Sequence, residues 1–315
     1  MSARARGCVY ATVTNILWGL SFIASKKALG AGFGTFSLSM IRFAIAAGVL
    51  FPVLRLREGR IALPGRDFAR LAAGAVTGIT LYFLFEYEAI KRTSASIVSL
   101  ILAAIPAFTL IFTALKTRRR YPAVCWLGVA ASLAGVYLVV RWGDPGAGSL
   151  AGNLLVLGAC ACWVAYIEIN DALFRRRSSL SITFWEALIA SVTLLPLALR
   201  EGMDLRRVTP EGWAMAAFLA LLCSVGGYLM YTESQRLLTP FHTALFINLN
   251  PVAAVLGGVL VLGETIAPAQ IAGGLIVLSV TGLLLWSRLH TIRLSAVCVS
   301  LAALLAGIWF MWTAI

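Results

Sequence analysis

Apolar runs of about twenty residues recur from one end of this chain to the other. Each run is long enough to cross, as a helix, a hydrocarbon core roughly 30 Å thick. Of the 315 residues, 60% are hydrophobic and only 12% are charged, which leaves too little polar surface for a soluble domain of this size. The sequence therefore predicts an all-α membrane protein. The expected spans are 8–29, 35–54, 69–90, 94–115, 122–140, 150–171, 180–199, 212–236, 240–262 and 268–287, with a candidate eleventh at 293–314.

The basic residues lie mostly in the short loops between spans, although the net charge of +13 could by itself suggest a nucleic-acid partner. Their distribution favours the lipid bilayer as partner and no nucleic acid. Loops on the side of the N-terminus carry more lysine and arginine than loops on the other side, and basic residues near helix ends resist translocation. We therefore expect a multi-pass protein of the cell inner membrane or plasma membrane with a cytoplasmic N-terminus.

Four pairs of residues recur at one offset of 145 positions. This regularity predicts a duplicated unit of five helices, the first at 8–141 and the second at 150–287. Because five is odd, the second copy enters the membrane from the opposite side to the first. Such inverted repeats are typical of secondary transporters, whose substrate site lies near the midplane between the halves. The pairs are Trp18 with Trp163, Pro106 with Pro251, Glu88 with Glu233, and Gly128 with Gly273.

Two parts of the chain are similar to a known family. ILWGLSFIASKKAL at 16–29 and SMIRFAIAAGVLFPVL at 39–54 resemble the opening of EamA-type members of the drug/metabolite transporter superfamily. The segment 231–285, which includes the Asn-x-x-Pro region and Gly263-Glu264, resembles the end of a second EamA unit. The resemblance implies ten helices, both termini cytoplasmic, alternating access, and small metabolites, often exported amino acids, as substrates.

The chain departs from the family pattern in two places. Arg119 stands in the first repeat where the second has Glu264, so the glutamate cannot act in both halves. The apolar tail at 293–315 lies beyond the family unit, and a spanning tail would place the C-terminus outside.

Ionisable residues inside predicted spans are functional candidates, because a charge near the bilayer centre costs several kcal/mol. Glu88 and Glu233 are expected at mirror-related depths, one near each gate, where either could take up a proton or bind a substrate ammonium. The alternative places them at the interface beside Lys91 or Arg236. For Glu168, an ion pair with the loop at 175–177 is expected. The complete set is Arg42, Glu86, Glu88, Glu168, Glu186 and Glu233.

Arg42 lies about a third of the way into the second span and corresponds by the repeat to Ala187, next to Glu186. Its guanidinium could pair with Glu86 or Glu88, or hold a substrate carboxylate through two parallel hydrogen bonds.

Several uncharged residues are further candidates. A tryptophan in a membrane interior needs an acceptor for its N–H group and offers a flat face to a substrate. Pro106 and Pro251 predict a helix bend beside a cavity in each half. The Gly74-x-x-x-Gly78 pattern predicts a close helix contact. The predicted substrate-binding residues are Trp18, Arg42, Tyr82, Glu86, Trp163, Asn248 and Asn250, and Glu88, Glu233, Pro106 and Pro251 are predicted for proton coupling or gating.

A secondary transporter is therefore the leading functional hypothesis. Its substrate would be an amino acid or related zwitterion, or alternatively a lipophilic or cationic metabolite, with protons as candidate co-substrates. A membrane-embedded enzyme is the main rival class, but the two histidines fall at span ends and no HExxH or GxSxG motif is present. The six cysteines predict neither a disulfide nor a metal site, and no cofactor or particular oligomeric state is predicted.

Overall fold

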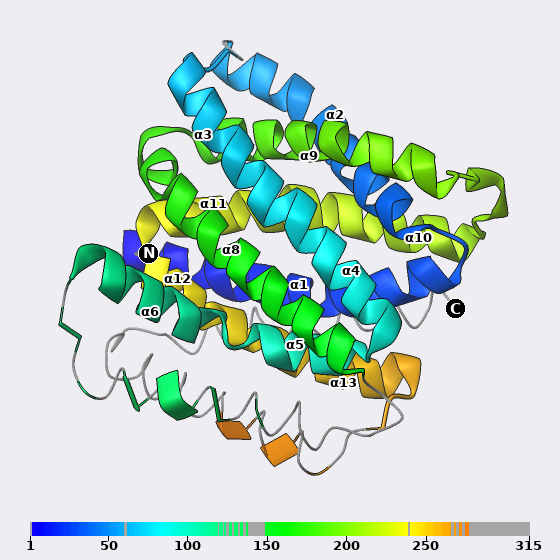
Figure 1. Ribbon diagram of the computed structural model, residues 1–315. Coiled ribbons are helices and arrows are strands. Elements are labelled where there is room, and N and C mark those ends of the chain that lie inside the picture. Colours follow the sequence, from blue (N-terminus) through cyan, green and yellow to red (C-terminus); the bar gives the residue numbers. More distant parts are fainter. Residues whose placement is uncertain are drawn as a thin grey trace.

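The computed structural model describes residues 2–59, 62–118, 149–238 and 240–265, with isolated positions between 120 and 137 and between 268 and 276. This part of the chain is a bundle of helices (Figure 1). The first half contains α1 (Ala3–Gly30), α2 (Thr35–Glu58), α3 (Gly65–Ala75), η1 (Val76–Leu81), α4 (Tyr82–Arg92), α5 (Ala95–Leu102) and α6 (Ile105–Thr117). The second half contains α8 (Leu150–Arg176), α9 (Ser179–Glu201), η2 (Leu205–Arg207), α10 (Pro210–Phe218), η3 (Leu219–Gly227), α11 (Tyr228–Leu237), α12 (Pro240–Leu245), η4 (Phe246–Leu249) and α13 (Asn250–Leu262).

The helices confirm the all-α prediction. Within the described residues, seven helical segments are long and apolar enough to cross a membrane, and each coincides with a predicted span. The predicted span at 240–262 is also helical, in the three pieces α12, η4 and α13. The predicted spans at 122–140, 268–287 and 293–314 lie outside the described residues, apart from isolated positions in the first two. Gly128 and Gly273 of the predicted repeat lie outside them as well.

The two halves run in opposite directions. We call the side of the bundle at which α1 begins the N-terminal face and the other side the opposite face. The second half begins at the opposite face, where the Ser149 N–H donates to the Arg92 carbonyl at the end of α4 over 3.2 Å. The inverted arrangement predicted from the odd number of helices is therefore present in the described part of the chain.

Helices α2 and α9 form the most extensive contact between the halves and lie side by side (Figure 1). At the opposite face, the carboxylate of Glu201, the last residue of α9, accepts hydrogen bonds from the backbone N–H groups of Phe36 and Ser37 in the first turn of α2, both at 3.0 Å. At the N-terminal face, Glu58 at the end of α2 accepts from Ser178, the N-cap of α9. Each helix thus supplies a carboxylate at the start of the other, where the first N–H groups have no partner within their own helix and a negative charge is favourable.

The spans that contain Pro106 and Pro251 are both interrupted, whereas the sequence predicts a bend in a continuous helix at each proline. The first is broken between α5 and α6 at Ala103 and Ala104, and the second passes through the 3-10 turn η4 before α13. Pro106 and Pro251 lie in the first turn of the helix that follows each break. A proline is well accommodated there, because the first-turn N–H that it lacks would have no partner within the helix.

A second repeated irregularity was not predicted. Both η1 and η3 are π-helical, and an offset of 145 places η1 within η3. Single π turns in α-helices are frequent at functional sites. The predicted close contact at Gly74 and Gly78 is present, since a Cβ at Gly78 would lie 2.3 Å from Tyr166 of α8.

Candidate functional site

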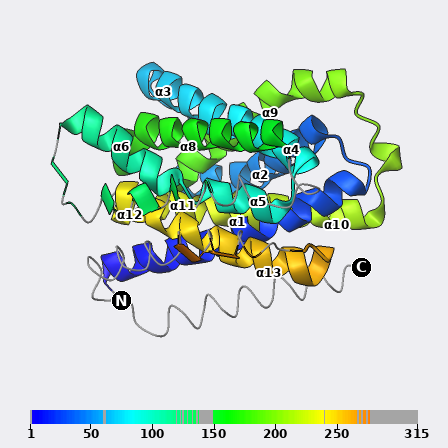
Figure 2. The ribbon, with the colours of Figure 1, turned by 60° about the horizontal axis from the view of Figure 1, so that its bottom comes forward.

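A central cavity lies where the two breaks approach α2, α4, α11 and the first helices of both halves. Its volume of about 30 Å³ holds only about two water molecules. Figure 2 shows α13, which supplies part of the lining, alongside α1. The lining residues are Trp18, Ser21, Phe22, Arg42, Tyr82, Phe83, Glu86, Leu102, Ile105, Trp163, Tyr228, Ile247 and Asn250. They include all of the predicted substrate-binding residues except Asn248, whose side chain lies outside the described part.

Aromatic rings form the wall of this cavity. Trp18 of α1 and Trp163 of α8 meet edge to face with their ring centroids 5.3 Å apart. The Tyr228 ring lies 5.1 Å from Trp18, and the Tyr82 ring lies 5.1 Å from Trp163. The Trp18 indole N–H donates to the Cys223 carbonyl in η3 at 3.2 Å, so the π segment provides the acceptor that a tryptophan in a membrane interior requires.

Arg42 is the buried cation of the cavity, with an exposed fraction of only 1%. Its Nε donates to Ser224 Oγ and its Nη1 to Tyr87 Oη, each at 2.9 Å. The guanidinium lies 4.7 Å from the centre of the Phe83 ring, in cation–π contact. Its partners in the described residues are therefore hydroxyls and aromatic rings.

Glu86 is the carboxyl group of the same cavity and is 3% exposed. The Tyr82 hydroxyl, one helical turn away in α4, is its polar neighbour. Neither Glu86 nor Glu88 is within ion-pair distance of Arg42, so this alternative from the sequence is not realised. A buried charge without a counter-ion is costly. The cavity thus offers a guanidinium and a carboxyl that do not neutralise each other by direct contact.

Asn250 adds an uncharged polar group at the start of α13. Its Oδ1 is buried and has no hydrogen-bond partner among the described residues. Because nearly all buried polar atoms in proteins have a partner, such an oxygen indicates a place where a ligand or water can donate.

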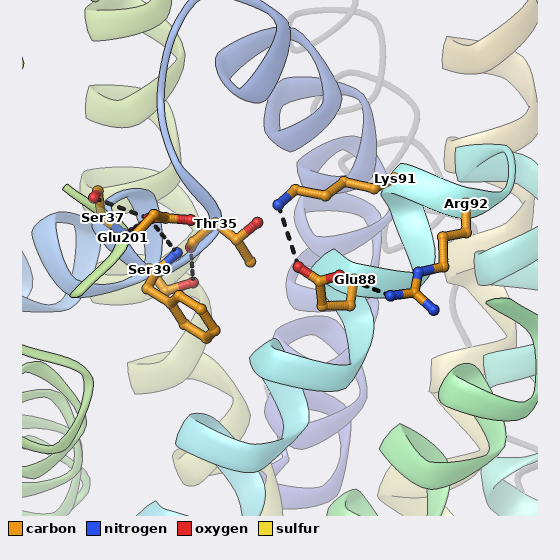
Figure 3. A network of polar contacts seen from close by, with 8 residues as sticks. Thr35, Ser37, Ser39, Glu88, Lys91, Arg92 and Glu201 are labelled. Atoms are coloured by element: carbon orange, nitrogen blue, oxygen red, sulfur yellow. Dashed lines mark hydrogen bonds and ion pairs between the residues drawn. The ribbon is translucent and has the colours of Figure 1, made fainter. Parts of the chain in front are cut away.

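Glu88 and Glu233 lie near the two faces, away from the cavity lining. Figure 3 shows Glu88 with Lys91 and Arg92, which it contacts at 3.2 and 3.4 Å. Glu233 pairs with Arg236 at 2.8 Å and accepts from Ser179 at 2.6 Å. Both carboxylates therefore lie beside Lys91 and Arg236 at opposite ends of the bundle, which is the alternative position that the sequence analysis gave for them.

Glu168 does not pair with the loop at 175–177 as the sequence predicts. It contacts Lys116 at 2.7 Å and Thr113 at 2.9 Å, both on α6. Arg175 instead pairs with Asp171, one turn earlier on its own helix. The prediction was wrong because it considered sequence neighbours, whereas α8 turns Glu168 toward α6.

The Gly263-Glu264 motif ties three helices together at the opposite face. Glu264 binds Lys26 of α1 at 2.8 Å and accepts from Ser96 Oγ and the Ala95 N–H at the start of α5. Burial raises the pKa of this carboxyl, but the hydrogen bonds from Lys26, Ser96 and Ala95 outweigh that effect and leave it below its usual value. The motif therefore acts here as a helix cap and an ion pair.

Two ion pairs join the halves at pseudo-equivalent positions. At the N-terminal face, Arg177 after α8 binds Asp67 in the first turn of α3, with Nε at 2.8 Å. At the opposite face, Lys27 in the last turn of α1 binds Glu211 in the first turn of α10 at 3.1 Å. In both cases the first helix of one half contacts the third helix of the other.

Sequence reasoning left out Tyr228, which lines the cavity, and Ser224, which binds Arg42. Tyr228 stands in the second repeat where Phe83 stands in the first, so the repeat carried a usable signal for it. For Ser224 the sequence offers no signal, because one serine among many apolar residues is unremarkable.

Two inverted helical halves around a cavity with buried charges define a membrane transporter fold. The profile of the EamA-like transporter family matches residues 5–141 and 150–288. This chain therefore belongs to the EamA-like transporter family.

Similar proteins carry transporter names without a stated substrate. An uncharacterized transporter of Archaeoglobus fulgidus is 24% identical over 272 residues, which cover 85% of this chain and 93% of that protein. The uncharacterized inner membrane transporter YedA of Escherichia coli K12 is 26% identical over 274 residues, which cover 84% and 86%. A solved crystal structure shares the fold with a TM-score of 0.68 at 16% identity, covering 89% of this chain and 98% of that one.

Proposed function

We propose that this protein moves a small zwitterionic metabolite across the membrane by alternating access, with export of an amino acid or a related compound as its principal activity. The observation that carries the proposal is the cavity that contains both Arg42 and Glu86 without an ion pair between them. A zwitterion could meet the guanidinium with its carboxylate and the carboxyl group with its ammonium. The proposal includes no catalytic step.

The proposed orientation places the N-terminal face in the cytoplasm and the protein in the cell inner membrane or plasma membrane. The excess of arginine and lysine in the loops on that face supports it.

A second candidate substrate is a lipophilic or cationic metabolite. The aromatic wall formed by Trp18, Trp163 and Tyr228 favours it, because aromatic faces attract cations and pack against apolar groups.

Substrate exchange in proteoliposomes that contain the purified protein distinguishes the zwitterionic from the cationic candidate. Uptake of a labelled amino acid is measured against three competitors: the same amino acid, its amide, which lacks the carboxylate, and its deaminated acid, which lacks the ammonium. We expect the amino acid to compete best, because only it satisfies both buried charges. An amide that competes as well as the amino acid would favour the cationic candidate.

The second prediction concerns the two ion pairs between the halves, which alternating access would open one at a time. Asp67→Asn should favour the state open at the N-terminal face, and Glu211→Gln the state open at the opposite face. The ion pairs are partly exposed, and the side chains of Arg177 and Asp67 have exposed fractions of 34% and 22%. The loss of either pair should therefore shift the equilibrium between the two open states by about 1 kcal/mol, or roughly fivefold in their population ratio.

Thiol labelling checks this second prediction. A Ser21→Cys probe in the cavity, on a background without the six native cysteines, is labelled with a membrane-impermeant reagent from either side. Labelling should rise from the N-terminal face for Asp67→Asn and from the opposite face for Glu211→Gln. Equal changes from both faces in each variant would contradict a gating role.

A further inference from the structure

Glu186, about a third of the way along α9, is a buried carboxyl group that the proposed substrate site does not use. Its exposed fraction is 0%, and it is absent from the cavity lining. It accepts hydrogen bonds from Tyr166 Oη at 3.2 Å and from Asn170 Nδ2 at 3.3 Å, both on α8. Within the described residues, no lysine, arginine or histidine is in ion-pair contact with it. Intramembrane carboxyl groups of this kind occur where protons are bound or relayed.

A file of hydroxyl groups lies between Glu186 and the N-terminal face, along α9 and α11. Thr183 and Ser179 precede Glu186 by three and seven positions in α9, so the three side chains lie on one side of that helix. Thr183 contacts Thr232 of α11 at 3.5 Å, and Ser179 donates to Glu233 at 2.6 Å. Glu233 is the interfacial carboxylate paired with Arg236. These hydroxyls are buried between α9 and α11, where they provide successive donors and acceptors in an otherwise apolar contact.

The cluster around Glu186 is the counterpart of the cluster around Arg42. Glu186 lies one residue from the repeat equivalent of Arg42, and Asn170 is the repeat equivalent of Ser25. Ser25 donates to Tyr87, which in turn accepts from Arg42. The first half thus places a permanent charge at this level of its second helix, whereas the second half places a group that can gain or lose a proton.

We infer that Glu186 is a proton-binding site that exchanges with the N-terminal face through Thr183, Thr232, Ser179 and Glu233, and that it couples transport to protons. The coupling rests on the proposed function, whereas the proton site itself does not. The step is a simple transfer: the Glu186 carboxylate gains one proton to become a carboxylic acid, and returns it along the same file. The other ionisable groups that face Glu186 are the phenols of Tyr166 on α8 and of Tyr228 and Tyr231 on α11. Tyr166 and Tyr231 also stack on Trp163, so Glu186 lies one layer of rings from the cavity.

Infrared spectroscopy of the purified full-length protein in lipid nanodiscs tests the site without a substrate. On a Glu86→Gln background, which removes the other buried carboxyl group described above, the carbonyl stretching band of a protonated carboxylic acid should be present and should be lost when Glu186→Gln is added. Glu168→Gln is the matched control, because Glu168 is ion-paired with Lys116, and it should keep the band. A band that persists in Glu186→Gln would overturn the inference.

Hydrogen–deuterium exchange of the protonated Glu186 carboxyl group tests the route. The exchange is followed as a shift of the same infrared band after transfer into deuterium oxide. The double variant Thr183→Val and Thr232→Val should slow the deuterium shift of the band, whereas Thr193→Val should not. Thr193 is a matched control on α9, since it contacts Thr80 and carbonyls of its own helix and lies outside the file. An unchanged exchange rate in the double variant would contradict the proposed proton route through Thr183 and Thr232.

Proteoliposomes then test the coupling. With a labelled amino acid as probe, Glu186→Gln should retain exchange without a gradient but lose the extra uptake that a pH gradient drives. If the infrared band is lost in Glu186→Gln but no amino acid is carried, the proposed function fails and the proton site stands. If an amino acid is carried and pH-driven uptake survives in Glu186→Gln, the coupling fails.

Discussion

Replacing Arg42 by alanine is expected to abolish high-affinity transport of an amino acid while sparing its amide. The guanidinium is buried between Ser224, Tyr87 and the Phe83 ring, and it faces the cavity without a carboxylate partner among the described residues. Removing one member of a buried charge pair costs about 2–5 kcal/mol, which corresponds to at least roughly thirtyfold in apparent affinity. The measurement is the concentration dependence of amino-acid and amide exchange in proteoliposomes.

Controls separate substrate binding from folding. Ser224→Ala and Tyr87→Phe each remove one hydrogen bond to Arg42 but keep its charge, so amino-acid transport should fall less than in Arg42→Ala. Equal loss of amino-acid and amide transport in Arg42→Ala would indicate a structural role for the arginine and would reject the zwitterion proposal.

Replacing Gly19 by alanine is expected to destabilise the packing of α13 on α1 and to lower the stability of the protein. A Cβ at Gly19 would lie 2.6 Å from the Asn250 carbonyl oxygen and 2.7 Å from the Ala253 Cβ. A backbone carbonyl cannot rotate away as a side chain can, so α13 would have to move from α1. Overpacking of this kind typically costs about 1–3 kcal/mol. Thermal unfolding in detergent measures the effect.

Gly48→Ala is the matched control for this substitution. Gly48 lies within α2, and a Cβ there would meet no atom within 4 Å. Alanine favours the helix over glycine by roughly 0.5–1 kcal/mol, so this variant should be as stable as the wild type or more so. If both variants unfold at the same temperature, the close packing of α13 on α1 at Gly19 does not limit stability.

The candidate cavity could be predicted to a large extent, because its residues violate the apolar pattern around them. Trp18, Arg42, Glu86 and Trp163 are conspicuous in membrane spans, and the repeat paired Trp18 with Trp163. The role of Glu168 could not be predicted, since its partner Lys116 lies on another helix. The helix breaks were anticipated only as bends, because a proline indicates where a helix is weakened and its neighbours decide how the chain continues.

The sequence by itself determined the spans and the inverted halves. The spans follow from local length and apolar composition, since a chain in lipid must satisfy its backbone hydrogen bonds within each helix. The inversion follows from the repeat of an odd number of helices at one offset. The tertiary structure alone decided which charged groups are paired. Arg42 meets Ser224 across 182 positions and Lys26 meets Glu264 across 238. Such contacts depend on how helices pack and rotate against one another, and no local pattern encodes them. Tertiary packing therefore places Arg42 and Glu86 in one cavity without a direct ion pair, and encloses Glu186 between α8, α9 and α11.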